Sequence, residues 1–389
     1  MATRSELEDT QSTKAANGQM PDELHPRHLV IRVAEVAVFI AAVVIAITAL
    51  PGLGEVKTRL KDATPGWVFA IALAEVGSAL GYLLCFRAVF CSRLPWGLSY
   101  DIAMSEQAAN SLLPAGGAGG LALGVWALRQ AGMPTGHIAR RTVAFFVITS
   151  AANFFALIVV GIGVFVGILA GNKSWVLTFV PALITALGVL VAGLSPKLLR
   201  ALGQRGAHAD DSTFSGKARL KGRSALAAMA DGIDQAIALL RTHSLGALSG
   251  SFFYMAFDIA ALGFAFAAVG HVPSFGTLVL GYLIGQLGNL IPLPGGIGGT
   301  EGALVGVFAL YGVNVSDAVA AVFLYRLFQL AIPAVLGAPA FVMLRRRLMH
   351  EDKPASVCGQ LAVDVVKLPA RTNGSVADRD SEATTRPQS

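Results

Sequence analysis

Two stretches of this chain carry residue types that interrupt a helix and expose its backbone. One reads Asn110-Ser-Leu-Leu-Pro-Ala-Gly-Gly-Ala-Gly-Gly120, and the other reads Asn289-Leu-Ile-Pro-Leu-Pro-Gly-Gly-Ile-Gly-Gly299. Proline and paired glycines break helices, and the free N–H groups of a following helix favour an anion such as a phosphate. We expect those following helices to begin near Leu121 and near Thr300. The alternative interpretation is that the glycines only allow helices to pack closely.

Three charged residues accompany the second stretch. Glu301 follows its last glycines, and we interpret it either as a first-turn acid favoured by the helix dipole or as a site for a proton, a cation or a cationic headgroup. Arg326 lies inside an apolar segment, where an arginine is costly unless it is paired or faces water. Its expected partner is Glu301 or Asp258. This arginine either holds a structural ion pair or binds phosphate, whose oxygens match the guanidinium geometry.

The candidate substrate-binding residues therefore combine the polar and flexible positions of both stretches with these three charged side chains. They are Asn110, Gly116, Gly117, Gly119, Gly120, Asn289, Pro294, Gly295, Gly296, Gly298, Gly299, Glu301, Arg326 and Asp258.

A second polar group precedes the first stretch. Asp101 and Glu106 come before Asn110 at helical spacing, and they either line a polar cavity or lie at the membrane interface. Glu35 and Glu75 also fall in or near apolar segments. Glu35 is close enough to a segment end to reach the surface, and we treat the deeper Glu75 as a weaker candidate.

Motifs for enzymatic chemistry are missing from the sequence. It contains no GxxxxGK[ST], HExxH or GxSxG motif, and no GxGxxG after a strand. The three cysteines form no CxxC pair, so no zinc site is indicated. We therefore expect no catalytic residues, no metal, no cofactor and no enzymatic activity.

Composition indicates which elements must position these residues. Of the 389 residues, 54% are hydrophobic and 14% are charged, whereas soluble domains carry about 25% charged residues. The apolar residues form blocks near the roughly 20 residues that a helix needs to cross a bilayer. We therefore predict an all-α integral membrane protein. Its apolar blocks are Leu29–Leu50, Trp67–Phe90, Val143–Ala170, Trp175–Leu194, Leu245–Val269, Phe275–Leu293 and Ala318–Leu344.

Basic residues lie between the apolar blocks, as the positive-inside rule describes, and this distribution argues against nucleic-acid binding. Applying the rule places both termini in the cytoplasm, with disordered tails at 1–26 and 346–389. The transmembrane domain then covers 27–345, with a basic cytoplasmic loop at 196–243. The segments Leu98–Ala131 and Phe275–Tyr311 must each enter and leave on one face, so we predict two re-entrant hairpins from opposite faces.

The two hairpins are related in sequence. Their asparagine and all four glycines align at an offset of 179 residues, and the flanking apolar blocks recur at nearly the same offset. The unpaired block at 175–194 reverses the orientation of the second copy. We therefore predict a polytopic helical bundle with an inverted repeat, a transporter architecture in which broken helices meet near the midplane.

The run from Pro292-Leu-Pro-Gly-Gly-Ile-Gly-Gly-Thr-Glu301, with Leu324-Tyr-Arg-Leu327 further on, resembles the flippase-like family that contains the transmembrane region of lysylphosphatidylglycerol synthase. The resemblance covers about residues 30–345. It implies movement of a phospholipid or lipid-linked substrate between leaflets. The polar loop and tails are too short for an aminoacyl-transfer site, so we do not expect lysyl transfer by this chain alone.

Two alternatives stay open at this point. The chain could be a non-transporting scaffold for a lipid or cell-envelope synthase, or a membrane enzyme that modifies lipids. Its expected partners are the bilayer, a membrane lipid or lipid-linked substrate, and a synthase. The Ala-, Val-, Gly- and Leu-rich composition favours a bacterial inner membrane.

Overall fold

The computed structural model of the chain describes residues 54–112, 118–172, 174–205, 231–238, 245–290 and 298–350. Throughout these ranges the regular structure is helical and no strand occurs, which confirms the predicted all-α class. The predicted block Leu29–Leu50, Glu35, the predicted tail at 1–26 and residues 351–389 of the predicted tail at 346–389 lie outside the described residues. Residues 346–350 of that second tail are helical and belong to the helix Val315–His350.

The helices follow one another in a repeating pattern of long and short elements. The first set comprises α3 (Gly54–Lys61), α4 (Pro65–Phe90), α5 (Trp96–Leu112), α6 (Ala118–Gln130) and α7 (Thr135–Val166). After α8 (Trp175–Arg205) and a helical segment at 231–238, the second set comprises α10 (Leu245–Ala268), α11 (Phe275–Gly285), the 3₁₀ helix η2 (Gln286–Leu290), α12 (Gly299–Leu310) and α13 (Val315–His350).

Four helices are long and apolar enough to cross a membrane: α4, α7, α10 and α13. Large apolar side chains also face outward on the bundle, among them Phe155, which is 70% exposed, and Val335, which is 68% exposed. Such a surface would be costly in water and is the one that lipid tails require. Among the described residues, α8 contributes a shorter apolar stretch, Trp175–Leu190.

Several boundaries differ from the sequence prediction for local reasons. Helix α7 ends at Val166, before the predicted Ala170, because Gly167 adopts a left-handed conformation (φ 88°) that closes the helix. Helix α13 begins at Val315, before the predicted Ala318, where the Asn314 side chain accepts a hydrogen bond from the Ser316 N–H at 2.8 Å. Helix α8 continues to Arg205, so the predicted basic loop starts inside a helix.

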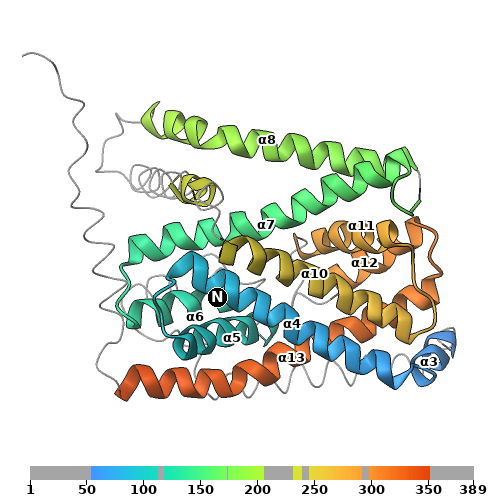
Figure 1. Cartoon of the computed structure of the whole chain (residues 1–389), viewed down its shortest axis with the longest axis horizontal. Coiled ribbons are helices and arrows are strands. Elements are labelled where there is room, and N and C mark those ends of the chain that lie inside the picture. The colour runs from blue at the N-terminus through green and yellow to red at the C-terminus, as the bar shows by residue number, and fades with distance from the viewer. Residues whose placement is uncertain are drawn as a thin grey trace, which may run out of the picture.

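Each predicted hairpin is a pair of short helices. Helix α5 packs on α6, and α11 packs on α12. Figure 1 shows the α5–α6 pair towards the left end of the bundle and the α11–α12 pair towards its right end, with α13 running beneath both. Each pair has its own buried apolar core, one around α5 and α6 and the other around α11 and α12.

The long helices α4 and α10 connect the two cores and run antiparallel. The N–H of Thr64, just before α4, donates to the carbonyl of Ala268 at the end of α10, at 3.2 Å. The helices touch through glycine, because a Cβ at Gly81 would overlap the Tyr254 backbone and one at Gly250 would overlap the Cys85 backbone. Antiparallel packing of equivalent helices is what an inverted repeat requires. The inverted topology and the re-entrant character of the hairpins remain predictions.

Candidate functional site

Glu301 closes the start of α12. Its Oε2 accepts a hydrogen bond from the N–H of Gly298 at 2.8 Å, which satisfies one of the donors left open at a helix N-terminus. Gly298 has φ 99°, a left-handed conformation that favours glycine, so the chain can turn sharply into the helix. The helix begins at Gly299, one residue before the predicted Thr300. The first-turn role expected for Glu301 is confirmed.

The same carboxylate holds Arg326, one of the two pairings predicted from sequence. Arg326 Nε donates to Glu301 Oε1 at 2.7 Å, joining α12 to α13. Both side chains are largely withdrawn from the surface, at 14% and 26% exposed. Arg326 Nη1 also donates to Gln329 Oε1 at 2.5 Å, one turn further along α13. A charge-assisted pair of this geometry fixes the guanidinium beside the N-terminus of α12.

Asp258 lies at the far end of this network. It is buried on α10, and its Oδ1 accepts a hydrogen bond from the hydroxyl of Tyr325 at 2.9 Å. The hydroxyl of Tyr282 donates to Oδ2, and the side-chain amide of Gln329 approaches both oxygens at 3.3 and 3.4 Å. Hydrogen bonds through Gln329 therefore link Asp258 to Arg326. Asp258, the other partner predicted for Arg326, forms no direct ion pair with it.

Glu75 joins the network from α4. It is 3% exposed, and its Oε1 is buried without a hydrogen-bond partner among the described residues. Its carboxyl group is close enough to Asp258 and Arg326 to interact electrostatically with both. We will call Glu75, Asp258, Glu301, Arg326 and Gln329, with the hydroxyls of Tyr282 and Tyr325, the α12 network. Its residues come from five helices.

The first hairpin closes the start of its second helix with a neutral group. The Asn110 side-chain oxygen, at the end of α5, accepts a hydrogen bond from the N–H of Gly120 at 3.0 Å. A Cβ on Gly120 would overlap that asparagine side chain and the Glu106 carbonyl, so only glycine fits there. Helix α6 begins at Ala118, three residues before the predicted Leu121.

Glu106 provides a second buried carboxyl group, one turn before Asn110. The hydroxyl of Tyr82, on α4, forms a hydrogen bond with it, and its Oε2 has no partner among the described residues. The ring of Tyr82 packs edge-to-face on Tyr254 of α10, with 5.6 Å between centroids. Tyr254 in turn interacts electrostatically with Asp258 and Glu75. A line of buried titratable groups thus runs from the first hairpin to the α12 network.

Asp101 does not join this line, although the sequence places it on the same helix as Glu106 and Asn110. Its carboxylate instead meets Arg347 of α13, with 3.3 Å between Oδ2 and Nε. The three polar residues of α5 therefore have three different partners.

Several predicted residues lie outside the described residues. They are Gly116, Gly117, Pro294, Gly295 and Gly296. Gly119 and Gly299 are buried at the starts of α6 and α12, and Asn289 belongs to η2. Sequence reasoning missed Tyr82, Tyr282, Tyr325 and Gln329 and gave Glu75 little weight. The sequence did offer two signals. Tyr325 precedes the intramembrane Arg326, and Gln329 follows that arginine by three residues on the same helical face.

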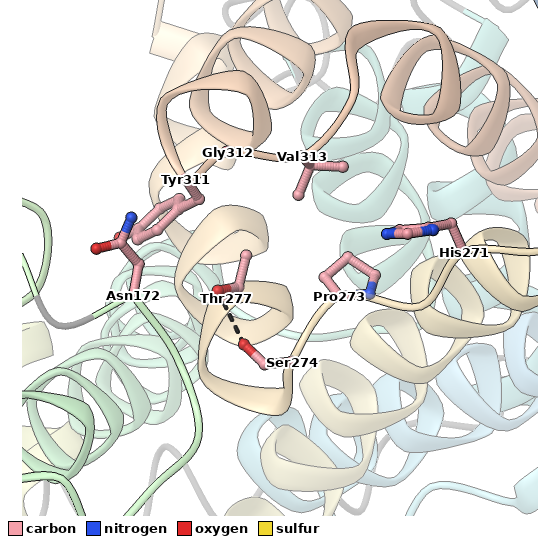
Figure 2. A pocket seen from close by; sticks show the side chains of 8 residues that line it. All are labelled: Asn172, His271, Pro273, Ser274, Thr277, Tyr311, Gly312 and Val313. Carbon is pink, nitrogen blue, oxygen red and sulfur yellow. Dashed lines mark hydrogen bonds between the residues drawn. The ribbon is translucent and has the colours of Figure 1, made fainter.

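A polar pocket of ≈ 360 Å³ lies away from all these groups, at the end of the bundle where α10, α11 and α12 terminate or begin. Figure 2 shows Ser274 and Thr277 joined by a hydrogen bond of 3.0 Å, with Tyr311 and Asn172 to one side and His271 to the other. The Tyr311 hydroxyl donates to the carbonyl of Leu177 at 2.6 Å, which ties α12 to α8. None of the residues predicted to bind substrate lines this pocket.

The helices and the buried charges define a class: a polytopic α-helical membrane protein with polar groups gathered where two short helical hairpins meet the long helices. The family model described as "Lysylphosphatidylglycerol synthase TM region" matches residues 33–337. The chain belongs to this family, as the glycine-rich motif and the Leu-Tyr-Arg-Leu segment predicted.

A curated relative supports the membrane assignment. The chain is 34% identical over 94 residues to a UPF0104 membrane protein of Methanothermobacter thermautotrophicus. That alignment covers 24% of this chain and 27% of the relative, so it spans about a quarter of each protein. No solved structure matches the chain.

Proposed function

We propose that this protein is a flippase-like transporter that moves a phospholipid or lipid-linked substrate between membrane leaflets. The observation that carries the proposal is the Glu301–Arg326 pair at the N-terminus of α12. A glycine-rich helix start offers backbone donors to an anionic headgroup, and a guanidinium within a membrane bundle is the side chain best suited to phosphate. Charges at this depth are costly and mark substrate or ion pathways.

In this proposal Glu301 regulates access to Arg326. With no headgroup present, the carboxylate neutralises the guanidinium and closes the start of α12. An arriving phosphate competes for Arg326, and Glu301 keeps its second bond to the Gly298 N–H. The headgroup would then pass from one hairpin to the other by alternating exposure, since the hairpins lie towards opposite ends of the bundle (Figure 1).

The remaining assignments form part of the same proposal. We place the protein in the cell membrane with both termini cytoplasmic, acting on lipid as a transporter and not as an enzyme. A cell-envelope synthase would supply or consume the transported lipid. The described residues hold no group of three or more His, Cys, Asp or Glu side chains that could bind a metal.

Lipid scrambling in liposomes that contain the purified full-length chain tests the proposal. Fluorescent phospholipids and lipid-linked substrates would be compared for the wild type, Glu301→Gln and Arg326→Ala. Arg59→Ala and Glu55→Gln are matched controls, because both change a charge on α3, outside the network. Protein-dependent scrambling that is lost only in the two network variants is the expected result. Folded wild-type protein that moves no lipid across a broad panel would favour the scaffold alternative.

A further inference from the structure

The α12 network carries more negative than positive charge. Glu75, Asp258 and Glu301 contribute three carboxyl groups, and Arg326 is the cation that the described residues place against them. If every group were ionised, two negative charges would remain uncompensated inside an apolar bundle. An uncompensated buried charge is too costly to persist, so a carboxyl group there neutralises by binding a proton.

The hydrogen bonds distinguish the two inner carboxyl groups. Asp258 accepts from the hydroxyls of Tyr282 and Tyr325, and the Gln329 amide lies near both of its oxygens. Donors of this kind stabilise a carboxylate. Glu75 receives no such donor at its buried Oε1, and it faces the negative charge of Asp258. A proton on Glu75 would therefore remove its repulsion from Asp258, and it would neutralise a carboxylate oxygen that has no hydrogen-bond donor among the described residues.

Glu75 also has titratable neighbours that lead away from it. Tyr254, from α10, interacts with Glu75 and Asp258, and its ring contacts Tyr82 on α4. Tyr82 in turn holds Glu106 of the first hairpin. The groups that face Glu75 are thus Asp258 and Tyr254 from α10 and Arg326 from α13. Beyond them lie Tyr282 of α11, Glu301 of α12 and the Cys85 thiol of α4, which interacts with Tyr254.

We infer that Glu75 is a proton-binding site that exchanges with water through Tyr254, Tyr82 and Glu106, and that this proton couples the protein to a proton gradient. In each exchange one proton leaves the Glu75 carboxyl group, each tyrosine hydroxyl on the path accepts one proton and releases another, and Glu106 or water takes up the last one. Since Tyr254 and Tyr82 meet through their rings, a water molecule must bridge their hydroxyls along this path. A proton fits better than a metal cation because a cation shared with Asp258 would have to displace the hydroxyls of Tyr282 and Tyr325 that donate to it. The coupling rests on the proposed transport function, whereas proton binding by Glu75 does not.

Infrared spectroscopy of the purified full-length chain in detergent micelles reads this proton directly, because a protonated carboxyl group has a carbonyl band that a carboxylate lacks. We expect the wild type at neutral pH to show such a band that Glu75→Gln removes. Glu55→Gln, on the exposed face of α3, is the matched control and should leave it unchanged. In heavy water the band should shift, and Tyr254→Phe should slow the shift at least about tenfold.

Each outcome decides the inference. An identical carbonyl region in wild type and folded Glu75→Gln overturns proton binding at Glu75. A band that Glu75→Gln removes but that never shifts in heavy water means a permanently trapped proton, which overturns exchange and coupling. Unchanged exchange in Tyr254→Phe overturns the path through Tyr254. Should Glu75→Gln fail to fold, Glu75→Asp keeps the carboxyl group and must retain a displaced band.

Because this readout needs no transport, it separates the inference from the proposed function. Absence of lipid scrambling with the Glu75 band present would defeat the transporter proposal and leave the proton site standing. Scrambling whose rate does not respond to an imposed pH gradient would defeat the coupling alone. A rate that responds to sodium and not to pH would replace the proton with a sodium ion and overturn the inference.

Discussion

The two hairpins use different side chains to bind the free N–H groups at the start of their second helix. Both interrupt a helical segment with prolines and glycines, and both restart with a helix whose first N–H groups need partners. In the first hairpin the neutral amide oxygen of Asn110 accepts from the Gly120 N–H. In the second, the carboxylate of Glu301 accepts from the Gly298 N–H and also holds Arg326. Only the second cap is part of a charged network.

This difference indicates that a repeated motif can keep its helix-breaking residues while the side chains that close the following helices differ in charge. The Asn110 side chain links α5 to α6 through the backbone N–H of Gly120. The nearby Glu106 forms its hydrogen bond with Tyr82 instead. The Glu301 cap continues through Arg326 and Gln329 to Asp258. We therefore expect the first hairpin to tolerate changes of its cap better than the second.

Among the variants that test the difference between the two hairpins, we expect Arg326→Ala to have the largest effect on stability and lipid scrambling. It leaves Glu301 without its cation and Gln329 without its donor, and breaking a buried pair from one side costs about 3–5 kcal/mol in soluble proteins. The pair is partly exposed, so we expect the lower end of that range, together with loss of lipid scrambling. Thermal unfolding in detergent and the liposome assay measure the two effects. Arg326→Lys, which keeps the charge without the forked geometry, should recover stability more than scrambling.

Gly81→Ala tests the contact that both halves share. The new methyl group would meet the Tyr254 backbone, so α4 and α10 must separate, at a cost of about 1–3 kcal/mol. Gly306→Ala in α12 is the matched control, because no atom lies near the added methyl group. It should be neutral or slightly stabilising, since alanine favours a helix over glycine. Equal melting temperatures for the two variants would refute the close α4–α10 contact.

Asn110→Ala sharpens the comparison of the caps. Removing a side-chain cap costs about 1 kcal/mol, and here no charge is left unpaired. We expect a small loss of thermal stability with scrambling within about twofold of the wild type. Glu301→Gln should behave in the opposite way, keeping an oxygen for the Gly298 N–H while losing scrambling. If Asn110→Ala abolished scrambling and Glu301→Gln did not, the assigned roles of the two hairpins would be reversed.

Small effects should also come from the two ion pairs that anchor α13 at its ends, each of which joins an exposed arginine to a buried aspartate. Arg59 meets Asp317 at 3.0 Å and Arg347 meets Asp101 at 3.3 Å. Both arginines are substantially exposed whereas both aspartates are buried, so we expect each pair to contribute about 1 kcal/mol, the upper end of the range for exposed pairs. Arg59→Ala and Arg347→Ala should each lower the melting temperature only slightly, and added salt should reduce the difference from the wild type. A large loss for either one would mean that α13 is held mainly at that end.

Much of the architecture follows from local patterns. Helix α4 covers the predicted block Trp67–Phe90, and α10 covers Leu245–Val269 to within one residue, because runs of apolar residues of spanning length fold as helices in lipid. The hairpins appear where prolines and glycines interrupt such runs. The need of Arg326 for an acidic partner was also predictable, since an arginine within a span is costly unless it is paired, but the sequence left Glu301 and Asp258 as alternatives.

Other features required the tertiary structure. The sequence left open whether Asp101 lines a polar cavity with Glu106 and Asn110 or lies at the membrane interface, and it gave no sign of the pairing with Arg347, which is far away in the sequence. Glu75 is a weaker candidate from sequence because no residue near it in the chain identifies a partner for a carboxyl group at that depth. Only the packing of α4 on α10 buries it next to Asp258.

The sequence by itself determined the all-α membrane class, the family and the positions of the two hairpins, because hydropathy and helix breaking act over short stretches of chain. It limited the partner of Arg326 to Glu301 or Asp258, and the structure shows the direct contact with Glu301. Tertiary structure decided which buried groups share a network. Tyr282, Tyr325 and Gln329 converge on Asp258 from helices that are distant in sequence, and hydrogen bonds depend on distances that no local pattern encodes.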